Sequence, residues 1–307
     1  MEKIVITGGE PLSGNITIGG SKNAILPIMA TCILTDEAVH LTNVPNLQDI
    51  QTMIKVLESL GVKADISNLN QNKLTVCYED IDKNIAEYDL VRKMRASVLI
   101  LGPLLARKKE ASVSLPGGCA IGARPIDIHI DALKKLGAEF VLDSGYVNCK
   151  APKGLRGNKI ELKKISVGAS ENIIMAASLA SGESEINNIA IEPEVIDLIK
   201  CLKSMGSEID FIGDRKILIQ GKENLRGTTH DVIPDRIEAG TYMIAGALIG
   251  NNLNIQNIEP DHLQNILNVF EELEIDFNLN KDSVSLSKSD IEMGVNLQTA
   301  EYPGFPT

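Results

Sequence analysis

The stretch VLESLGVKADI, residues 56–66, joins the end of an amphipathic helical pattern to a short strand through a Leu-Gly turn. Three later stretches end in the same way, and they are DALKKLGAEFVL (131–142), KCLKSMGSEIDF (200–211) and NVFEELEIDFNL (268–279). The turn residue is Gly61, Gly137 or Gly206 in the first three copies and Glu274 in the fourth. Glycine just after a helix is typical of a C-terminus that reverses into a strand. The chain therefore contains a repeat that returns every 68–76 residues.

Each copy also has a second helical pattern upstream, which is rich in small and aliphatic residues. These patterns are SKNAILPIMATCIL (21–34), RKMRASVLILGPLLA (92–106), GASENIIMAASLASG (168–182) and RIEAGTYMIAGALIG (236–250). An alternating strand pattern follows each of them, so the unit reads β-α-β-α-β-(β). Helices that are apolar all round have to be buried, whereas the amphipathic ones lie outside. Buried helices wrapped by strands predict an inside-out α/β arrangement, and an ordinary α+β fold with coincidental spacing is the alternative.

The composition excludes several classes of protein. With 307 residues, 44% of them hydrophobic, and with five Tyr, five Phe and no Trp, the chain fits one or two globular domains with an aliphatic core. Its net charge of −11 argues against a general nucleic-acid-binding surface, so a few local cations have to hold any anionic ligand. The apolar stretch Val98 to Ala106 is about half a membrane span, and MEKIVITGGE lacks a signal-peptide pattern.

The cysteines and the missing motifs exclude further classes. The five cysteines are odd in number and widely spaced, and no CxxC occurs, which argues against a disulfide framework and a zinc site. They are Cys32, Cys77, Cys119, Cys149 and Cys201. The sequence also lacks a Walker P-loop, a GxGxxG fingerprint and HExxH. We therefore expect a reduced, cytoplasmic protein without a metal or cofactor.

The motif GGSKNA, residues 19–24, is the first candidate for chemistry. A strand pattern ends in two glycines, and Ser21 then opens a helix that contains Lys22 and Asn23. Backbone N–H groups at a helix start attract anions, and Lys22 adds a full charge. The alternative is an ordinary strand-to-helix turn with a solvated lysine. Residues Ser166, Val167 and Gly168 precede the apolar helix of the third unit and are the repeat equivalent of this motif.

The stretch PGGCAIGARPIDIHI, residues 116–130, is the second candidate. Its Pro and Gly residues predict an exposed loop, and Cys119 lies near Arg124. A thiol beside a cation has a lowered pKa and can act as a nucleophile or a proton donor. The other four cysteines lie in helix or strand patterns and are interpreted as small buried hydrophobes.

Two further polar positions accompany that loop. Asp127 and His129 alternate with isoleucines, so in an extended segment they would point the same way and could contact a polar ligand. A satisfied structural histidine is the alternative for His129, and the remaining histidines are interpreted as structural. Arg95 opens an otherwise apolar helix, which is unusual unless it faces a cleft.

At these residues the sequence resembles a known family, the UDP-N-acetylglucosamine enolpyruvyl transferases. The motifs that carry the resemblance are GGSKNA, MRAS, LPGGCAIGARPIDIHI, SVGAS, EPEVID, PDRIEAG and the terminal YPGFPT, and they span residues 19–307. The sister family, the 5-enolpyruvylshikimate-3-phosphate synthases, shares the repeat architecture. Its first motif reads GSKS, and it lacks the GGC loop.

The resemblance implies a fold of two inside-out α/β barrel domains, each made of three β-α-β-α-β-β units. Residues 22–234 would form a continuous domain of three repeats that carries the cysteine loop. Residues 1–21 and 235–307 would form the second domain from both chain ends. Because only one repeat is left for that domain, we expect it to be incomplete, with its C-terminal part missing.

The resemblance also implies a reaction. The enolpyruvyl group of phosphoenolpyruvate would pass to the 3′-hydroxyl of UDP-N-acetylglucosamine with release of phosphate, as the first committed step of peptidoglycan synthesis in the cell wall. By resemblance Cys119 is the proton donor and the target of fosfomycin, and phosphoenolpyruvate is held by Lys22, Asn23, Cys119 and Arg124. The residues matching the nucleotide-sugar ligands are Arg95, Arg124, Pro125, Ile126, Asp127, Ile128, His129, Lys164, Ile165, Ser166, Val167 and Gly168. The implied partners are these two small molecules, without nucleic acid, membrane or obligate protein partner.

The end of the sequence departs from the family pattern. In the family an Asp follows the FPT motif and acts as the base near the sugar hydroxyl, whereas here Thr307 is the last residue. We therefore expect residues 1–307 alone to be inactive. Two other hypotheses stay open: the shikimate-pathway enzyme, and a non-catalytic nucleotide-sugar-binding module of the same fold.

Overall fold

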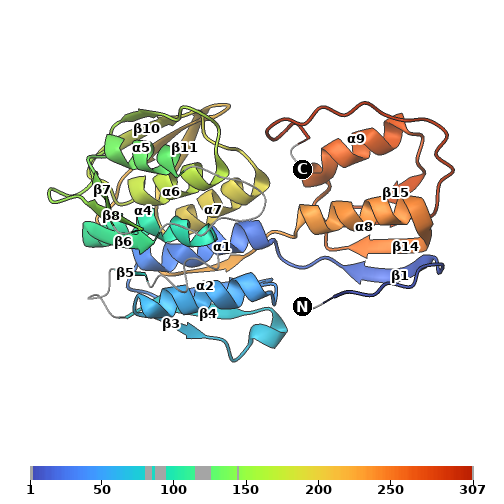
Figure 1. Cartoon of the computed structure of the whole chain (residues 1–307), viewed down its shortest axis with the longest axis horizontal. Coiled ribbons are helices and arrows are strands. Elements are labelled where there is room, and N and C mark those ends of the chain that lie inside the picture. Colours follow the sequence, from blue (N-terminus) through green and yellow to red (C-terminus); the bar gives the residue numbers. More distant parts are fainter. Residues whose placement is uncertain (1–2, 80–84, 87–94, 115–125, 144, 306–307) are drawn as a thin grey trace. The chain divides into compact units, whose positions relative to one another are not determined.

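The computed structural model describes residues 3–79, 85–86, 95–114, 126–143 and 145–305. The chain divides into two compact units, one formed by Gly20–Ile233 and the other by Met1–Gly19 with Pro234–Thr307. Figure 1 labels most of their helices and strands. No helix in the described part of the chain combines the length and the apolar character that crossing a membrane requires.

The larger unit, residues 20–233, contains three copies of the predicted repeat. The first copy comprises α1 (Lys22–Ala30), η1 (Thr31–Leu34), β2 (Val39–Thr42), α2 (Gln48–Ser59), β3 (Val62–Asp65), η2 (Leu69–Gln71) and β4 (Leu74–Tyr78). The second comprises β5 (Ile85–Ala86), η3 (Arg95–Ile100), α4 (Leu101–Lys108), β6 (Glu110–Ser114), α5 (Asp127–Lys135), β7 (Glu139–Asp143) and β8 (Tyr146–Lys150). The third comprises β9 (Lys159–Glu161), α6 (Val167–Ala177), β10 (Glu183–Asn187), α7 (Pro193–Ser204), β11 (Glu208–Gly213) and β12 (Lys216–Gln220), and β13 (Thr228–Asp231) follows it.

The smaller unit contains one further copy. Its elements are β1 (Leu12–Thr17), α8 (Arg236–Ile249), β14 (Gly250–Gln256), η4 (Pro260–Leu263), α9 (Gln264–Glu272), β15 (Phe277–Leu279) and β16 (Ser283–Leu286).

All four sheets have the same topology. Their strand orders are β13-β2-β4-β3, β5-β6-β8-β7, β9-β10-β12-β11 and β1-β14-β16-β15. In each, the first pair is parallel and the other two are antiparallel. The predicted repeat is therefore confirmed. Among the described residues each sheet is an open row of four strands, and none closes into a barrel.

The first strand of a sheet is the edge strand that pairs in parallel with its neighbour. In two of the sheets this strand comes from a distant part of the chain. β13 comes just before the helix α8 of the smaller unit, yet it pairs with β2, with Thr228 opposite Val39. β1 comes just before α1 of the larger unit, yet it pairs with β14, with Thr17 opposite Gln256. Each unit therefore closes one of its sheets with a strand that is distant in sequence.

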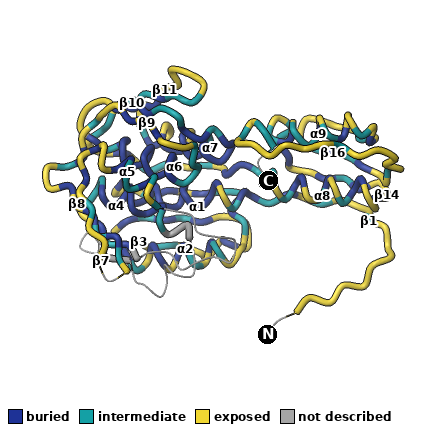
Figure 2. Tube along the Cα trace, turned by 45° about the horizontal axis from the view of Figure 1, so that its top comes forward, coloured by how far each residue is buried: buried dark blue, intermediate teal, exposed yellow. Residues whose placement is uncertain are grey.

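The predicted burial of the apolar helices is confirmed in the larger unit. Every residue from Ala24 to Ala30 of α1, and from Ala169 to Ala177 of α6, is buried. These helices lie inside the unit while the sheets surround them (Figure 1), and they appear as continuous buried segments in Figure 2. In the smaller unit α8 is not buried all round, because Ile244 and Leu248 are 47% and 53% exposed. Its other face packs on the sheet through Met243 and Ala247.

The turns that revealed the repeat have the predicted backbone. The φ angles of Gly61, Gly137 and Gly206 are 93°, 97° and 99°, and that of Glu274 is 54°. These are left-handed conformations, in which a helix ends and the chain reverses into a strand. The Leu-Gly signature is therefore a property of the backbone rather than of side-chain chemistry.

Candidate active site

The predicted helix start at GGSKNA is confirmed. Ser21 is buried, and its hydroxyl accepts a hydrogen bond from the Ala24 N–H at the first turn of α1. Lys22 Nζ lies 3.2 Å from Asp49 Oδ2, and both side chains are about two-fifths exposed. The second glycine has a packing reason, because a Cβ at Gly20 would lie 1.7 Å from the Asn43 carbonyl oxygen. The lysine is thus held at the N-terminus of a buried helix by a nearby carboxylate.

The third repeat reproduces this start. Ser166 caps α6 by accepting a hydrogen bond from the Ala169 N–H, as Ser21 does from Ala24. Both donor–acceptor distances are 3.4 Å. Val167 and Gly168 form the first turn of α6, where backbone N–H groups have no partner within the helix. The proposed equivalence of the SKN and SVG segments is therefore confirmed in geometry.

The 3₁₀ segment η3 packs against both of these helices, α1 and α6. It begins at Arg95 and continues into α4. The side chain of Arg95 lies outside the described residues, as do the whole of Cys119, Arg124 and Pro125. Their predicted roles stay predictions.

The segment after the cysteine loop is helical, so the extended backbone on which a shared direction of Asp127 and His129 depended is not formed. Ile126 is the N-cap of α5, and Asp127 is its first residue. Residues two apart on a helix point roughly 200° away from each other. Asp127 is accordingly exposed while His129 is buried, so the two side chains do not share a face. The alternating isoleucines pack as helix positions instead.

His129 is a hydrogen-bonded buried residue. Its Nδ1 lies 2.9 Å from Asn172 Nδ2 on α6, and only 8% of the residue is exposed. Burial lowers the pKa of His129 to about 4, and the nearby Asp127 carboxylate opposes this only in part. A Cβ at Gly168 would lie 3.1 Å from His129 Cε1, so the ring rests on the first turn of α6. The structure thereby brings together two of the predicted nucleotide segments.

Besides Asp197, three further buried carboxylates in the described part of the chain were missed by the sequence analysis. Glu171 on α6 and Glu192 and Glu194 at the start of α7 are all less than 8% exposed. Burial, together with the carboxylates of Glu194 and Glu192, raises the pKa of Glu171 well above its usual range. Glu171 Oε1 has no hydrogen-bond partner among the described residues. Carboxylates inside apolar helical patterns, as in GASEN and EPEVID, were the sequence signal that could have indicated them.

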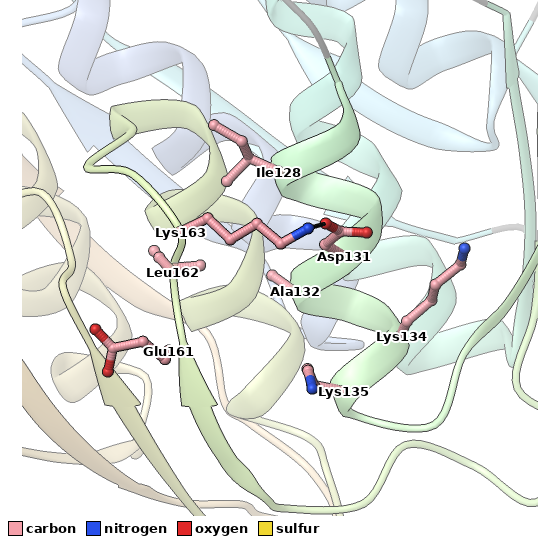
Figure 3. Close-up of a pocket in the computed structure, with 8 residues that line it drawn as sticks. All are labelled: Ile128, Asp131, Ala132, Lys134, Lys135, Glu161, Leu162 and Lys163. Carbon is pink, nitrogen blue, oxygen red and sulfur yellow. Dashed lines mark hydrogen bonds and ion pairs between the residues drawn. The ribbon is translucent and has the colours of Figure 1, made fainter.

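A pocket of about 440 Å³ opens beside α5, the helix that carries His129 (Figure 3). It is lined by Ile128, Asp131, Ala132, Lys134, Lys135, Glu161, Leu162 and Lys163. Lys163 reaches across it to form an ion pair with Asp131 of α5. Of the predicted site residues that the structure describes, only Ile128 lines this pocket, whereas Lys164 to Gly168 follow directly after Lys163 in the chain. The pocket therefore lies beside the described part of the predicted site.

The fold has relatives among solved structures. The crystal structure of the enolpyruvyl transferase NikO from Streptomyces tendae matches with a TM-score of 0.82 at 22% identity, over 92% of this chain and 67% of that one. EPSP synthase from Acinetobacter baumannii matches with a TM-score of 0.71 at 18% identity, over 92% of this chain and 66% of that one. At these identities the likeness shows a mixed α/β fold of the enolpyruvyl transferase kind.

Sequence relatives are closer. A curated UDP-N-acetylglucosamine 1-carboxyvinyltransferase from Koribacter versatilis is 48% identical over 309 aligned residues, covering 100% of this chain and 71% of that protein. One from Zymomonas mobilis is 45% identical, covering 100% of this chain and 73% of that protein. The family described as EPSP synthase (3-phosphoshikimate 1-carboxyvinyltransferase) matches residues 6–307. The chain therefore belongs to the enolpyruvyl transferase family, and within that family it is similar to UDP-N-acetylglucosamine 1-carboxyvinyltransferases.

Proposed function

We propose that the protein transfers the enolpyruvyl group of phosphoenolpyruvate to the 3′-hydroxyl of UDP-N-acetylglucosamine and releases phosphate. The observation that carries this proposal is the 45–48% identity, over the whole chain, to carboxyvinyltransferases named for that nucleotide sugar. The GGC loop and the SKNA motif support the same substrate over shikimate 3-phosphate. The cellular role would be the first committed step of peptidoglycan synthesis in the cytoplasm, with consequences for cell shape and division.

The geometry of the larger unit supports an anionic substrate. Two buried helices, α1 and α6, begin with serine caps, and both pack against η3. Helix N-termini carry partial positive charge and unpaired N–H groups, which favour phosphate and carboxylate oxygens. Lys22 adds a cation at one of these starts. In a protein with a net charge of −11, such local positive sites attract an anionic ligand that the overall charge would repel.

The chemistry assigns roles to the residues that match the family. The C2 carbon of phosphoenolpyruvate becomes electrophilic when C3 is protonated, and we assign that proton to the Cys119 thiol. The sugar 3′-oxygen then bonds to C2 while its hydroxyl proton passes to a base. The C2–O bond to phosphate breaks, phosphate leaves, and C3 returns a proton to the Cys119 thiolate, so the double bond is restored. Lys22, Asn23 and Arg124 would hold phosphoenolpyruvate, while Arg95, the segment 124–129 and the segment 164–168 would hold the nucleotide sugar.

The proposal includes the domain assignment. Residues 22–234 would be the continuous domain of an inside-out, two-domain enolpyruvyl transferase, and residues 1–21 with 235–307 would belong to the other. The shared topology of the four sheets supports this assignment, because each is one unit of the same repeat. The interacting molecules would be the two small-molecule substrates.

Phosphate release tests the function directly. The purified protein is assayed with phosphoenolpyruvate and either UDP-N-acetylglucosamine or shikimate 3-phosphate, and calorimetric titration with each acceptor gives its affinity. We expect the nucleotide sugar, and not shikimate 3-phosphate, to bind, and we expect any phosphate release to occur only in the presence of the nucleotide sugar. Release with shikimate 3-phosphate alone would assign the sister activity, and tight nucleotide-sugar binding without release by the protein isolated from its own cells would identify a binding module.

Lys22 offers a sharper test of the site. A charge-assisted contact to phosphate contributes about 1.5–3 kcal/mol, so Lys22→Ala should weaken phosphoenolpyruvate binding roughly 10- to 150-fold. The matched control is Lys63→Ala, which removes an exposed lysine paired with Glu79 on another part of the same unit. Equal affinities of both variants would remove Lys22 from the site.

A further inference from the structure

The carboxamide of Asn172 joins three segments of the larger unit. Asn172 lies on α6 and is completely buried. Its Oδ1 accepts a hydrogen bond from the Gly102 N–H at 2.7 Å, and its Nδ2 lies 2.9 Å from the Val98 carbonyl oxygen. The same Nδ2 lies 2.9 Å from His129 Nδ1 on α5. One side chain thus contacts α5 and the junction of η3 with α4.

At that junction the carboxamide takes the place of a backbone hydrogen bond. Gly102 and Val98 are four residues apart, so in a continuous α-helix their N–H and C=O would bond to each other. The Asn172 side chain is inserted between them and bonds both. Side-chain insertion of this kind is a recognised cause of a break in a helix. A Cβ at Gly102 would lie 2.4 Å from the Asn172 carbonyl oxygen, so only glycine permits this approach.

The two backbone partners fix the orientation of the amide. A backbone N–H can only donate and a backbone carbonyl can only accept. Oδ1 therefore has to face Gly102 and Nδ2 has to face Val98. Because Nδ2 is then the donor toward His129, the Nδ1 atom of that ring has to be the acceptor. The neutral imidazole consequently carries its proton on Nε2.

The protonated edge of the ring rests on the start of α6. A Cβ at Gly168 would lie 3.1 Å from His129 Cε1 and 3.4 Å from Nε2. Gly168 belongs to the first turn of α6, the segment to which the proposed function assigns the diphosphate. Burial of the ring keeps it uncharged, in agreement with the low pKa of His129. A neutral N–H donor is therefore held next to the N–H groups of a helix start.

We propose that Asn172 is a positioning residue of the nucleotide-sugar site, which holds His129 in the Nε2–H tautomer so that this N–H donates to an oxygen of the bound nucleotide sugar. The inference rests on the proposed function and adds to it a residue outside the family motifs quoted above. Through Gly102 and Val98 the same side chain also sets the start of α4, and therefore the end of the η3 segment that begins at Arg95. Asn172 thereby positions two of the segments assigned to the nucleotide sugar, the one that contains His129 and the one that begins at Arg95.

The tautomer is measured directly by two-bond ¹H–¹⁵N correlation spectra of histidine-labelled protein. The chain has four histidines, and the His129→Gln variant identifies the His129 signals by their loss. We expect the Nε2–H pattern from pH 5.5 to 8, with and without UDP-N-acetylglucosamine. An Nδ1–H pattern in the wild-type protein would overturn the proposal without any variant having to fold.

Asn172→Asp tests the link between the two residues. A carboxylate cannot donate, so His129 Nδ1 would have to become the donor, and the spectrum should change to the Nδ1–H or the doubly protonated form. The matched control is Asn158→Asp, which adds the same charge and removes a side-chain hydrogen bond to the Lys135 carbonyl at the far end of α5. An unchanged His129 pattern in folded Asn172→Asp would refute the link.

Nucleotide-sugar titration of two His129 variants tests the donor. The amide nitrogen of Gln occupies roughly the place of Nε2, whereas that of Asn occupies the place of Nδ1. We expect His129→Gln to bind within about 3-fold of wild type and His129→Asn to bind about 10-fold more weakly or worse. Equal affinities of the two variants would overturn the proposal. Absence of binding by the wild-type protein would instead refute the proposed function. The tautomer spectra would then be the measurement that tests the link between Asn172 and His129.

Discussion

Burial raises the pKa of all four cysteine thiols in the described part of the chain. Burial raises the pKa of Cys149 and of Cys201 to about 12, and raises that of Cys32 further still. Cys77 is partly exposed, yet burial and the carboxylates of Glu79 and Asp36 raise its pKa too. The thiolate is the reactive form, so all four described cysteines are poorly reactive at neutral pH.

Cys119 should therefore be labelled fastest by iodoacetamide. Its loop motif places it near Arg124, which lowers rather than raises the pKa of a thiol. Peptide mapping after short exposure at pH 7 gives the relative rates, with Cys77 as the comparison because it is the most accessible of the other four. Faster labelling of Cys77 would contradict the assignment of Cys119 as the proton donor. In the active enzyme, fosfomycin should protect Cys119 from iodoacetamide.

The buried carboxyl group of Glu171 should make the free energy of unfolding depend on pH. Burial and two nearby carboxylates raise the pKa of its carboxyl group well above the usual range, so the folded protein holds this proton more tightly than the unfolded chain does. In the unfolded chain it ionises above about pH 4.3, so folding takes up a proton at higher pH. The stabilising contribution is complete below the unfolded pKa and is lost as pH rises toward the folded pKa.

Glu171→Gln should accordingly stabilise the protein at neutral pH. We expect a gain of about 0.5–2 kcal/mol in the free energy of unfolding at pH 8, and a smaller difference at pH 5. Thermal unfolding at both pH values measures it, with the exposed Glu183→Gln as control. A loss of stability that is equal at both pH values would show that the carboxyl group makes a specific contact instead.

Individual side chains were the least predictable part of the site. The start of α1 was predictable because Ser, Lys and Asn after two glycines leave few backbone alternatives. The face on which His129 lies was not predictable, since alternating isoleucines fit a strand and a short helix equally well and only packing against α6 decides between them. The Asn172 network depends on residues 43 to 74 positions apart, which no local pattern records.

At the scale of elements, the helix-to-strand turn was predicted in all four copies. The copies share a left-handed residue, and glycine adopts that backbone without the steric cost that other residues pay. The strand ends share another device that was not predicted. Asn43, Asn188 and Asn257 all have φ between 54° and 62°, and each donates its side-chain N–H to the backbone carbonyl of Val232, Leu162 or Ile18. That pairing is visible only once the parallel neighbour strand is known.

Glu274 is the exception among the turn residues and gives a clean test. Its φ of 54° costs a non-glycine residue about 1 kcal/mol, so Glu274→Gly should raise the free energy of unfolding by up to about 1 kcal/mol. Urea denaturation measures the change. Glu272→Gly, at the end of α9, is the matched control and should lose about 0.5–1 kcal/mol, because glycine is a poor helix former. Destabilisation by Glu274→Gly would show that its side chain makes a compensating contact.

At the scale of the molecule, the exchanged strands decide what can fold alone. The larger unit is a single continuous stretch, 20–233, and its core cluster draws only on residues within that stretch. The smaller unit needs β1 from the start of the chain to complete its sheet with β14. Its helix α8 also leaves Ile244 and Leu248 half exposed, whereas α1 and α6 are covered all round. The repeat number was predictable from the sequence pattern. The exchange was not, because the first strands of all the repeats look alike in that pattern, and only the family resemblance implied that both chain ends belong to one domain.

A fragment of residues 20–233 should therefore fold on its own, and the decisive element is its last strand. β13 hydrogen-bonds to β2, and Val232 and Ile233 just after it are buried at 1% and 7% exposure. Removing them opens an edge on that sheet and uncovers the core around α1, which costs about 1.5–3 kcal/mol for each large apolar side chain exposed.

Fragment 20–233 should unfold in one cooperative transition and should keep the His129 tautomer of the parent chain, whereas fragment 20–222 should be markedly less stable or unfolded. Circular dichroism melts and the histidine spectra of both fragments measure this. Similar stability of the two would mean that β13 is dispensable and that the boundary of the continuous domain lies earlier in the chain.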